Sequence, residues 1–205
     1  MRKARRLSLE ELAPHLLDPP DPPALLNWST IFGNDHPVEL EIGFGKGAVL
    51  VAAGQARSEM NFVGVEIDRA LQLYVASRLA KRSLRNVRLV KADARQFVRD
   101  CVADASVEAV HVYFPDPWWK TRHKKRRVFT GEFAAQCQRV LRPDGRLFLA
   151  TDVEEYFGVM TRLVAENTRL KPISWPAKDQ TWETNFERKA RQQGRSVWRI
   201  AFLRP

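Results

Sequence analysis

From residue 38 onward, short apolar segments alternate with segments of helical periodicity, and no other feature constrains the fold as strongly. The apolar segments predict strands at 38–42, 62–67, 87–91, 107–114 and 146–150. The segments of helical spacing predict helices at 49–55, 69–82, 94–102 and 133–141, and another that follows Thr151 and runs to 167. Such alternation places parallel strands in one sheet through right-handed crossovers, with helices on both faces.

Two further strands are predicted late in the chain, near 169–175 and at 197–203. No helix of comparable length is expected between them, so they can pair as an antiparallel edge. The predicted fold class is therefore α/β, with a mostly parallel seven-stranded sheet, an antiparallel edge and helices on both faces. Three local signals are the Asp68 helix cap, a turn at Arg142-Pro-Asp-Gly, and a capping box of Thr151 with Glu154.

The 205 residues suffice for one well-filled domain, predicted at 31–205. Residues 1–30 are predicted to form a basic, proline-rich arm and linker, because five prolines lie within 14–23. Cys101 and Cys137 show no metal-type spacing, which indicates a reduced, cytoplasmic protein. No apolar run approaches the ~20 residues that span a bilayer, so we expect no membrane partner.

The charge of the chain favours a polyanionic partner. Lys and Arg number 34 against 24 Asp and Glu, which gives a net charge of +10. Nucleic acid is the expected partner, and a basic surface kept for solubility is the alternative. The four histidines are scattered and predict no metal site.

A glycine-rich segment, Glu41-Ile-Gly-Phe-Gly-Lys-Gly47, follows the first main strand. Gly43 and Gly45 permit a tight turn and let a ligand approach the backbone, while the next helix offers free N–H groups. The same residues also satisfy the dinucleotide fingerprint of NAD-binding proteins. A plain glycine turn with no ligand is the third interpretation.

Three carboxylates at strand ends favour S-adenosylmethionine over NAD. Glu41 directly precedes the glycines, where it can hold a cationic amino group but would repel a pyrophosphate. Glu66 can accept from both hydroxyls of a ribose, and Asp93 from the exocyclic amine of adenine. Asp93 can alternatively be a helix N-cap.

Residues 113–127 combine an acidic group, aromatic rings and dense positive charge. Asp116 lies between two prolines, and Trp118 and Trp119 follow it. Cationic side chains then fill much of the next eight positions: Lys120, Arg122, Lys124, Lys125, Arg126 and Arg127. This combination is typical of chemistry on a base within a nucleic acid; a Pro-Asp-Pro turn beside a solvated charged loop is the alternative.

Taken together, these motifs resemble those of the bacterial tRNA (guanine-N7-)-methyltransferase family. The matching segments run in family order across most of 38–203: Leu-Glu-Ile-Gly-Phe-Gly-Lys-Gly, Gly-Val-Glu-Ile, Lys-Ala-Asp-Ala, Phe-Pro-Asp-Pro-Trp-Trp-Lys, Arg-His-Lys-Lys-Arg-Arg, residues 151–156 and Thr184-Asn-Phe-Glu187. The glycine loop is generic to class I methyltransferases, whereas the Phe-Pro-Asp-Pro-Trp run joined to the basic segment is specific. One departure is Ala190, where the family usually has glycine.

The resemblance implies a Rossmann-like class I methyltransferase fold and methyl transfer from S-adenosylmethionine to N7 of guanine 46 in tRNA. It implies a cofactor site of Glu41, Gly43, Gly45, Glu66, Asp93, Ala94 and Asp116, with Asp116 as the catalytic residue. It implies substrate contacts from Lys120, Asp152, Thr184, Asn185, Phe186 and Glu187. It implies RNA contacts from Arg122, His123, Lys124, Lys125, Arg126 and Arg127. The enzyme is expected to act without a metal, as a monomer or homodimer.

The chemistry of guanine N7 gives Asp116 a specific expected role. N7 has an in-plane lone pair and no proton, so no general base is needed, and a carboxylate can stabilise the cationic product. Glu187 could accept from N1–H and N2–H₂ of a guanine removed from its stack. Its alternative role is a capping box with Thr184. Two other functions remain open on the residues alone: a NAD-type oxidoreductase and a non-catalytic RNA-binding protein.

Overall fold

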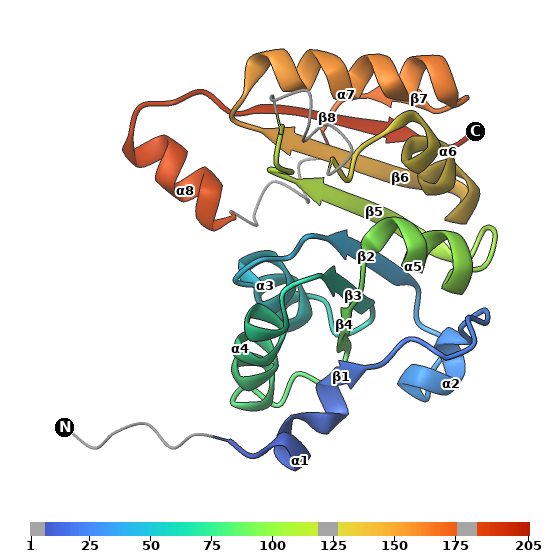
Figure 1. Ribbon diagram of the computed structural model, residues 1–205, viewed down its shortest axis with the longest axis vertical. Coiled ribbons are helices and arrows are strands. Elements are labelled where there is room, and N and C mark those ends of the chain that lie inside the picture. The colour runs from blue at the N-terminus through green and yellow to red at the C-terminus, as the bar shows by residue number, and fades with distance from the viewer. Residues whose placement is uncertain (1–6, 119–126, 176–183) are drawn as a thin grey trace.

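The computed structural model describes residues 7–118, 127–175 and 184–205 (Figure 1). Over these residues one sheet has eight strands in the order β1-β4-β3-β2-β5-β6-β8-β7. The strands are β1 (Leu16–Leu17), β2 (Val38–Ile42), β3 (Asn61–Glu66), β4 (Val87–Lys91), β5 (Val107–Tyr113), β6 (Leu141–Thr151), β7 (Lys171–Ile173) and β8 (Trp198–Leu203). Each pairing among β1 to β6 is parallel, and β8 is antiparallel to both β6 and β7. The predicted fold class, α/β with an antiparallel edge, is confirmed.

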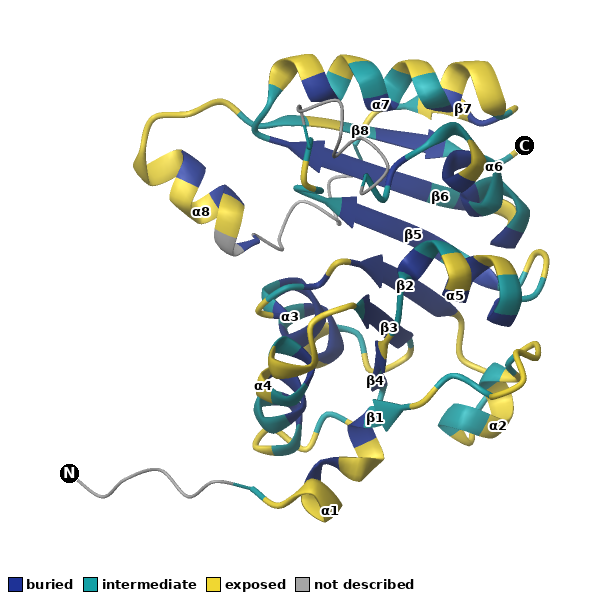
Figure 2. Ribbon diagram, in the orientation of Figure 1, coloured by how far each residue is buried: buried dark blue, intermediate teal, exposed yellow. Residues whose placement is uncertain are grey.

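The helices are α1 (Leu9–Leu12), α2 (Trp28–Phe32), α3 (Ala48–Ala56), α4 (Arg69–Ala80), α5 (Ala94–Cys101), α6 (Gly131–Val140), α7 (Glu154–Asn167) and α8 (Asn185–Gln192), with a short 3₁₀ helix at Ala13–His15. Helices α5, α6 and α7 pack on one face of the sheet, around Leu40 and Val110. Helices α3 and α4 pack on the other, around Leu89. Figure 2 shows the strands buried between these layers. Within the described ranges, no helix is long and apolar enough to cross a membrane.

Alternation along the central strands sets which side chains face each layer. In β2, Leu40 faces the α5–α7 layer, so Glu39 and Glu41 face the layer of α3. In β5, Val110 and Val112 face the α5–α7 layer, and His111 between them faces the other way. Three charged or polar side chains of these two strands therefore enter a largely apolar layer: Glu39, Glu41 and His111.

The sheet has one strand more than the sequence predicted. Leu16 and Leu17, within the segment expected to be a linker, pair in parallel with Leu89 and Val90 at the edge. The edge position tolerates the surrounding prolines, which cannot donate to a ladder. The expectation of no comparable helix between the last two strands was wrong, because α8 lies there.

Two local predictions near β6 need correction. The segment Arg142-Pro-Asp-Gly was expected to be a turn, but it forms a bulge inside β6, where Leu141 pairs with Val107 and Arg146 pairs with Ala109. The predicted capping box of Thr151 and Glu154 is wrong. Strand β6 continues through Thr151, and α7 begins only at Glu154 with Val153 as its N-cap. The Thr151 hydroxyl instead accepts from the Val153 N–H at 3.2 Å.

Candidate functional site

Two hollows lie at the carboxyl ends of the parallel strands, where α/β proteins bind their ligands. The larger hollow has a volume of about 360 Å³ and is lined by Glu41, the glycine loop, Tyr113, Phe114 and the start of α8. The smaller hollow has a volume of about 160 Å³ and is lined by Glu66, Asp93 and Ala94, among others. Gly43 lines both, so the two hollows adjoin at the glycine loop.

The glycine loop adopts a backbone that favours glycine. Gly43 has φ of +71° and Gly45 has φ of +49°, and a Cβ atom on either would meet nothing within 4 Å. Conformation rather than crowding therefore explains both glycines. The space beside them is open to a ligand. The Gly45 N–H donates to Oε2 of Glu66 at 3.0 Å, which ties the loop to the end of β3.

Glu41 is a buried acid at the end of β2, and it lines the larger hollow. Burial raises the pKa of Glu41 to about 8, and the charge of Glu66 adds to the rise. Its Oε2 atom is buried and has no hydrogen-bond partner. An unpartnered buried carboxyl oxygen is costly, and a cationic ligand group would satisfy it.

Glu66 organises the backbone around it. Its Oε1 accepts from the N–H groups of Ile67 at 2.9 Å and Asp68 at 3.2 Å, while Oε2 accepts from Gly45. A carboxylate has about four acceptor positions, so three are occupied by the backbone. The ribose contact predicted for Glu66 must share the carboxylate with these amides.

Asp93 caps α5, as one of its two interpretations predicted. It accepts from the backbone N–H of Arg95 at 2.9 Å, and the Arg95 guanidinium lies 2.8 Å from its other oxygen. The hydrogen bond from the Arg95 side chain is the main cause that lowers the pKa of Asp93. Asp93 also lines the smaller hollow, so its predicted contact with adenine remains a prediction.

The start of α8 forms one side of the larger hollow. Thr184 and Glu187 form a capping box, with hydrogen bonds of 3.0 Å and 3.2 Å, and buried Glu187 also pairs with Arg199. Phe186 is 59% exposed and stacks on Phe114, with ring centroids 5.7 Å apart. Both rings line the larger hollow and offer an aromatic face to a ligand.

Ala190, at the position where the resembling family usually has glycine, is part of a helix. Ala190 lies within α8 and is 0% exposed. The helix continues past it to Gln192, so there is no turn directly after Glu187.

Other predicted site residues lie outside the two hollows or outside the described ranges. Asp116 is exposed, and Asp152 forms an ion pair with Arg195. The Nε of Arg127 donates to the carbonyl of Pro117 at 2.6 Å. The predicted substrate and RNA residues outside the described ranges are Lys120, Arg122, His123, Lys124, Lys125 and Arg126. The side chain of Asn185 is not described either.

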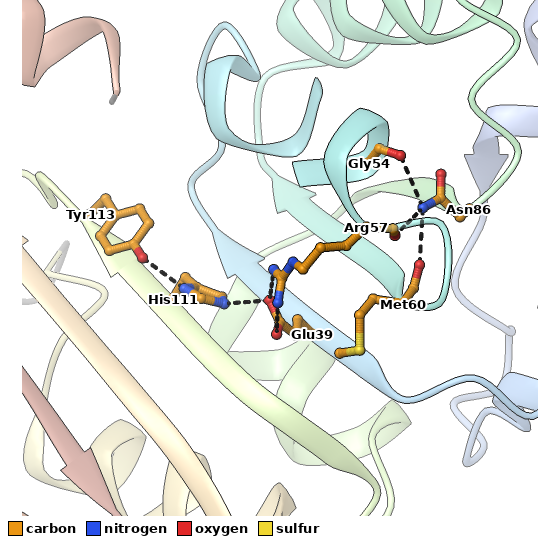
Figure 3. Close-up of polar contacts among 7 residues, drawn as sticks. All are labelled: Glu39, Gly54, Arg57, Met60, Asn86, His111 and Tyr113. Carbon is orange, nitrogen blue, oxygen red and sulfur yellow. Dashed lines mark hydrogen bonds and ion pairs between the residues drawn. The ribbon is translucent and has the colours of Figure 1, made fainter. Parts of the chain in front are cut away.

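A buried polar network, which the sequence analysis missed, adjoins the larger hollow (Figure 3). The Tyr113 hydroxyl lies 2.7 Å from Nδ1 of His111, whose Nε2 lies 3.0 Å from Oε2 of Glu39. Arg57 donates to both oxygens of Glu39, at 2.8 Å and 2.6 Å. The amide of Asn86 holds the chain near Arg57 by donating to three carbonyls, those of Gly54, Arg57 and Met60.

The network has a clear electrostatic state. Burial alone would raise the pKa of Glu39, but the hydrogen bond and charge of His111 and those of Arg57 outweigh it and lower the pKa to about 2. Ionised Glu39 therefore accepts a hydrogen bond from Nε2 of His111. A signal was present in the sequence: Glu39 alternates with apolar residues in a strand, and a buried acid requires a partner.

Known proteins resemble this chain over most of its length. A family model described as "Putative methyltransferase" matches residues 35–200. The tRNA (guanine-N(7)-)-methyltransferase of Rhodopirellula baltica is 40% identical over 91% of this chain and 73% of its own length. The protein of the same name in Hydrogenovibrio crunogenus is 36% identical over 88% of this chain and 77% of its own. The crystal structure of the 16S rRNA methyltransferase KamB covers 87% of this chain and 93% of its own, with a TM-score of 0.64 at 17% identity, which shows a shared fold.

Proposed function

The chain belongs to the tRNA (guanine-N(7)-)-methyltransferase family, and on that premise we propose that it methylates N7 of a guanine in tRNA with S-adenosyl-L-methionine as donor. The guanine we propose is position 46 of the variable loop, as the sequence resemblance implies. One structural observation carries the choice of donor: the buried Oε2 of Glu41 has no partner beside the larger hollow. The amino group of the donor is a cation that fits this oxygen.

The residues around the two hollows fit the parts of the donor. Glu41 would hold the amino group, Gly43 and Gly45 would let the donor approach the backbone, and Glu66 would accept from the ribose. Asp93 and Ala94 would border the adenine in the smaller hollow. When bound, the donor supplies a methyl group activated by attachment to a positively charged sulfur.

The chemistry needs orientation more than proton transfer. A bond forms from the N7 lone pair to the methyl carbon while the carbon–sulfur bond breaks, and its electron pair remains on the sulfur. Guanine thereby gains the positive charge that the sulfur loses. Holding N7 in line with the breaking bond can contribute ~7–11 kcal/mol in favourable systems. Asp116 would stabilise the charge that develops on the purine, and no residue need remove a proton.

Phe186 and Phe114 would give the guanine an aromatic face, worth ~1–3 kcal/mol per stacked base. Glu187 is already engaged by Arg199 and by the Thr184 N–H, so reading the guanine edge would require it to exchange partners. Further contacts that we propose to the tRNA come from Lys120, Asp152, Thr184, Asn185, Arg122, His123, Lys124, Lys125, Arg126 and Arg127. We propose that the protein acts in the cytoplasm, as a monomer or homodimer.

The test is incubation of the purified protein with bulk tRNA that lacks 7-methylguanosine and with donor labelled in its methyl group. Label in the tRNA that depends on intact Asp116 would support the proposal. Binding of tRNA without any label would instead indicate a non-catalytic RNA-binding protein. Calorimetric titration with S-adenosylmethionine and with NAD provides the control, because an oxidoreductase would bind NAD.

A further inference from the structure

Helix α8 carries an exposed cationic face beside the larger hollow. From Asn185 to Arg195 the chain has four cations, Arg188, Lys189, Arg191 and Arg195, against one carboxylate, Glu187. All four cations are exposed, whereas Glu187 is buried and paired with Arg199. Arg195 lies beyond the end of the helix and pairs with Asp152, so the exposed surface of α8 itself carries Arg188, Lys189 and Arg191.

The spacing of these residues separates two sides of the helix. Thr184, Glu187 and Ala190 recur every three residues and are buried. Arg188 and Arg191 are likewise three residues apart, so their Cβ atoms are neighbours, about 5–6 Å apart, on the exposed side. Figure 2 shows α8 exposed along most of its length and projecting away from the sheet. This side of the helix is exposed to solvent, where it can contact an anionic partner.

The position of α8 relative to the larger hollow indicates what that partner is. Thr184 and Phe186 at its start line the hollow, and so does Lys189 one turn later. A base that enters the hollow must bring its own sugar-phosphate backbone to the surface beside it. Arg188 and Arg191 lie within two turns of that entry point.

We infer that the exposed face of α8 binds backbone phosphates of the tRNA next to the guanine that enters the larger hollow. This inference rests on the proposed function and adds an RNA-binding surface to it. Arg188 and Arg191 supply charge to the phosphates, and such contacts hold the register of the RNA without reading its sequence. Phe186 of the aromatic pair and the cationic face both lie on α8, so one helix contributes to holding both the base and its backbone.

The experiment compares tRNA affinity across salt concentrations for two neutralised double variants. R188Q/R191Q removes two charges from α8. K81Q/R85Q removes the same charge from two exposed residues at and beyond the end of α4. These residues lie near the amino ends of the strands, whereas the larger hollow lies at the carboxyl ends. Each phosphate contact contributes about 0.7–0.9 to the slope of log affinity against log salt. We expect R188Q/R191Q to flatten the slope by about 1.4–1.8 and to weaken binding roughly 30-fold at 0.1 M salt.

The control variants separate a phosphate contact from other causes. K81Q/R85Q should keep the wild-type slope, and R188K/R191K, which retains the charge, should recover most of the affinity. An unchanged slope in R188Q/R191Q, or the same change in K81Q/R85Q, would overturn the inference. Failure of R188K/R191K to restore binding, together with a lowered melting temperature in both α8 variants, would show that the arginines are structural and would also overturn it.

Methyl transfer by the wild-type protein is measured in parallel, so that the two proposals fail separately. Wild-type methylation with an unchanged slope in R188Q/R191Q would leave the proposed function intact and remove the α8 surface. A flattened slope without any methylation would leave the α8 surface intact and remove the proposed function.

Discussion

His111 Nε2 lies 3.0 Å from Oε2 of Glu39, and the two side chains join neighbouring strands within the sheet. Because Glu39 is ionised, it accepts a hydrogen bond from Nε2 and thereby orients the ring, and Nδ1 on the other side of the ring lies 2.7 Å from the Tyr113 hydroxyl. Tyr113 in turn lines the larger hollow. A buried charge on one strand thus positions a residue of the candidate site on another.

Replacing Tyr113 by Phe should remove the contact with His111 while keeping the ring. We expect the free energy of unfolding to fall by about 1 kcal/mol, the net value of a typical hydrogen bond. Donor affinity should fall as well, because the ring is no longer held against the hollow. Urea unfolding and calorimetry measure the two effects. Tyr74→Phe, on exposed Tyr74 in α4, is the matched control and should change neither.

Glu39 should make the protein sensitive to acid. The pKa of Glu39 is lowered from 4.5 to about 2 in the folded state, so Glu39 takes up a proton less readily in the folded protein than in the unfolded chain. The stability it contributes is present above pH 4.5 and is lost as the pH falls towards 2. Glu39→Gln should flatten the pH dependence of the unfolding free energy in this range. Equal acid sensitivity in the variant and the wild type would contradict this role.

Glu41→Gln should stabilise the protein while weakening donor binding. The folded state keeps a proton on Glu41 up to about pH 8, whereas the unfolded chain loses it near pH 4.5, so stability falls as pH rises between these values. At pH 7 this difference costs about 3 kcal/mol, which a neutral glutamine avoids. Urea unfolding at pH 5, 7 and 8.5 checks the slope.

Calorimetry with S-adenosylmethionine checks the binding half of the same prediction. A cationic ligand favours ionised Glu41, so wild-type affinity should rise with pH up to about 8. Glu41→Gln should bind weakly at every pH, without this rise. Tight binding by the variant would show that the buried oxygen does not hold the donor.

Asp116→Asn and Asp116→Ala should separate electrostatics from turn structure. Both lack the charge that we propose stabilises the methylated purine, so both should slow single-turnover methyl transfer. The loss should exceed any change in donor affinity or melting temperature, since Asp116 is exposed. Wild-type rates in both variants would make Asp116 structural only.

The strands and helices of the central fold were predictable because hydrophobic periodicity sets them locally. The segment 38–42 matched β2, 87–91 matched β4, and Asp68 caps α4 as predicted. The short strand β1 was not predictable, because two leucines between prolines carry no periodicity and pair only through β4. The cap predicted at Thr151 is wrong because β6 extends through this residue.

The candidate site was partly predictable for a similar reason. Parallel topology brings strand ends together, so Glu41, Glu66 and Asp93 were expected at one edge of the sheet, and they line the two adjoining hollows. Asp116 and Asp152 were expected there as well, but they line neither hollow. The network of Glu39, His111 and Arg57 depends on register between strands that are distant in sequence. Local patterns do not contain that register. The stacking of Phe186 on Phe114 is long-range for the same reason.

Nucleoside analysis of the reacted tRNA tests the central claim most directly. After incubation with wild-type protein and S-adenosylmethionine, digestion and mass spectrometry should show 7-methylguanosine as the methylated product, mapped to guanine 46, with S-adenosylhomocysteine formed in equal amount. Methyl groups found only on other atoms or other bases, or no methylated nucleoside at all, would contradict it.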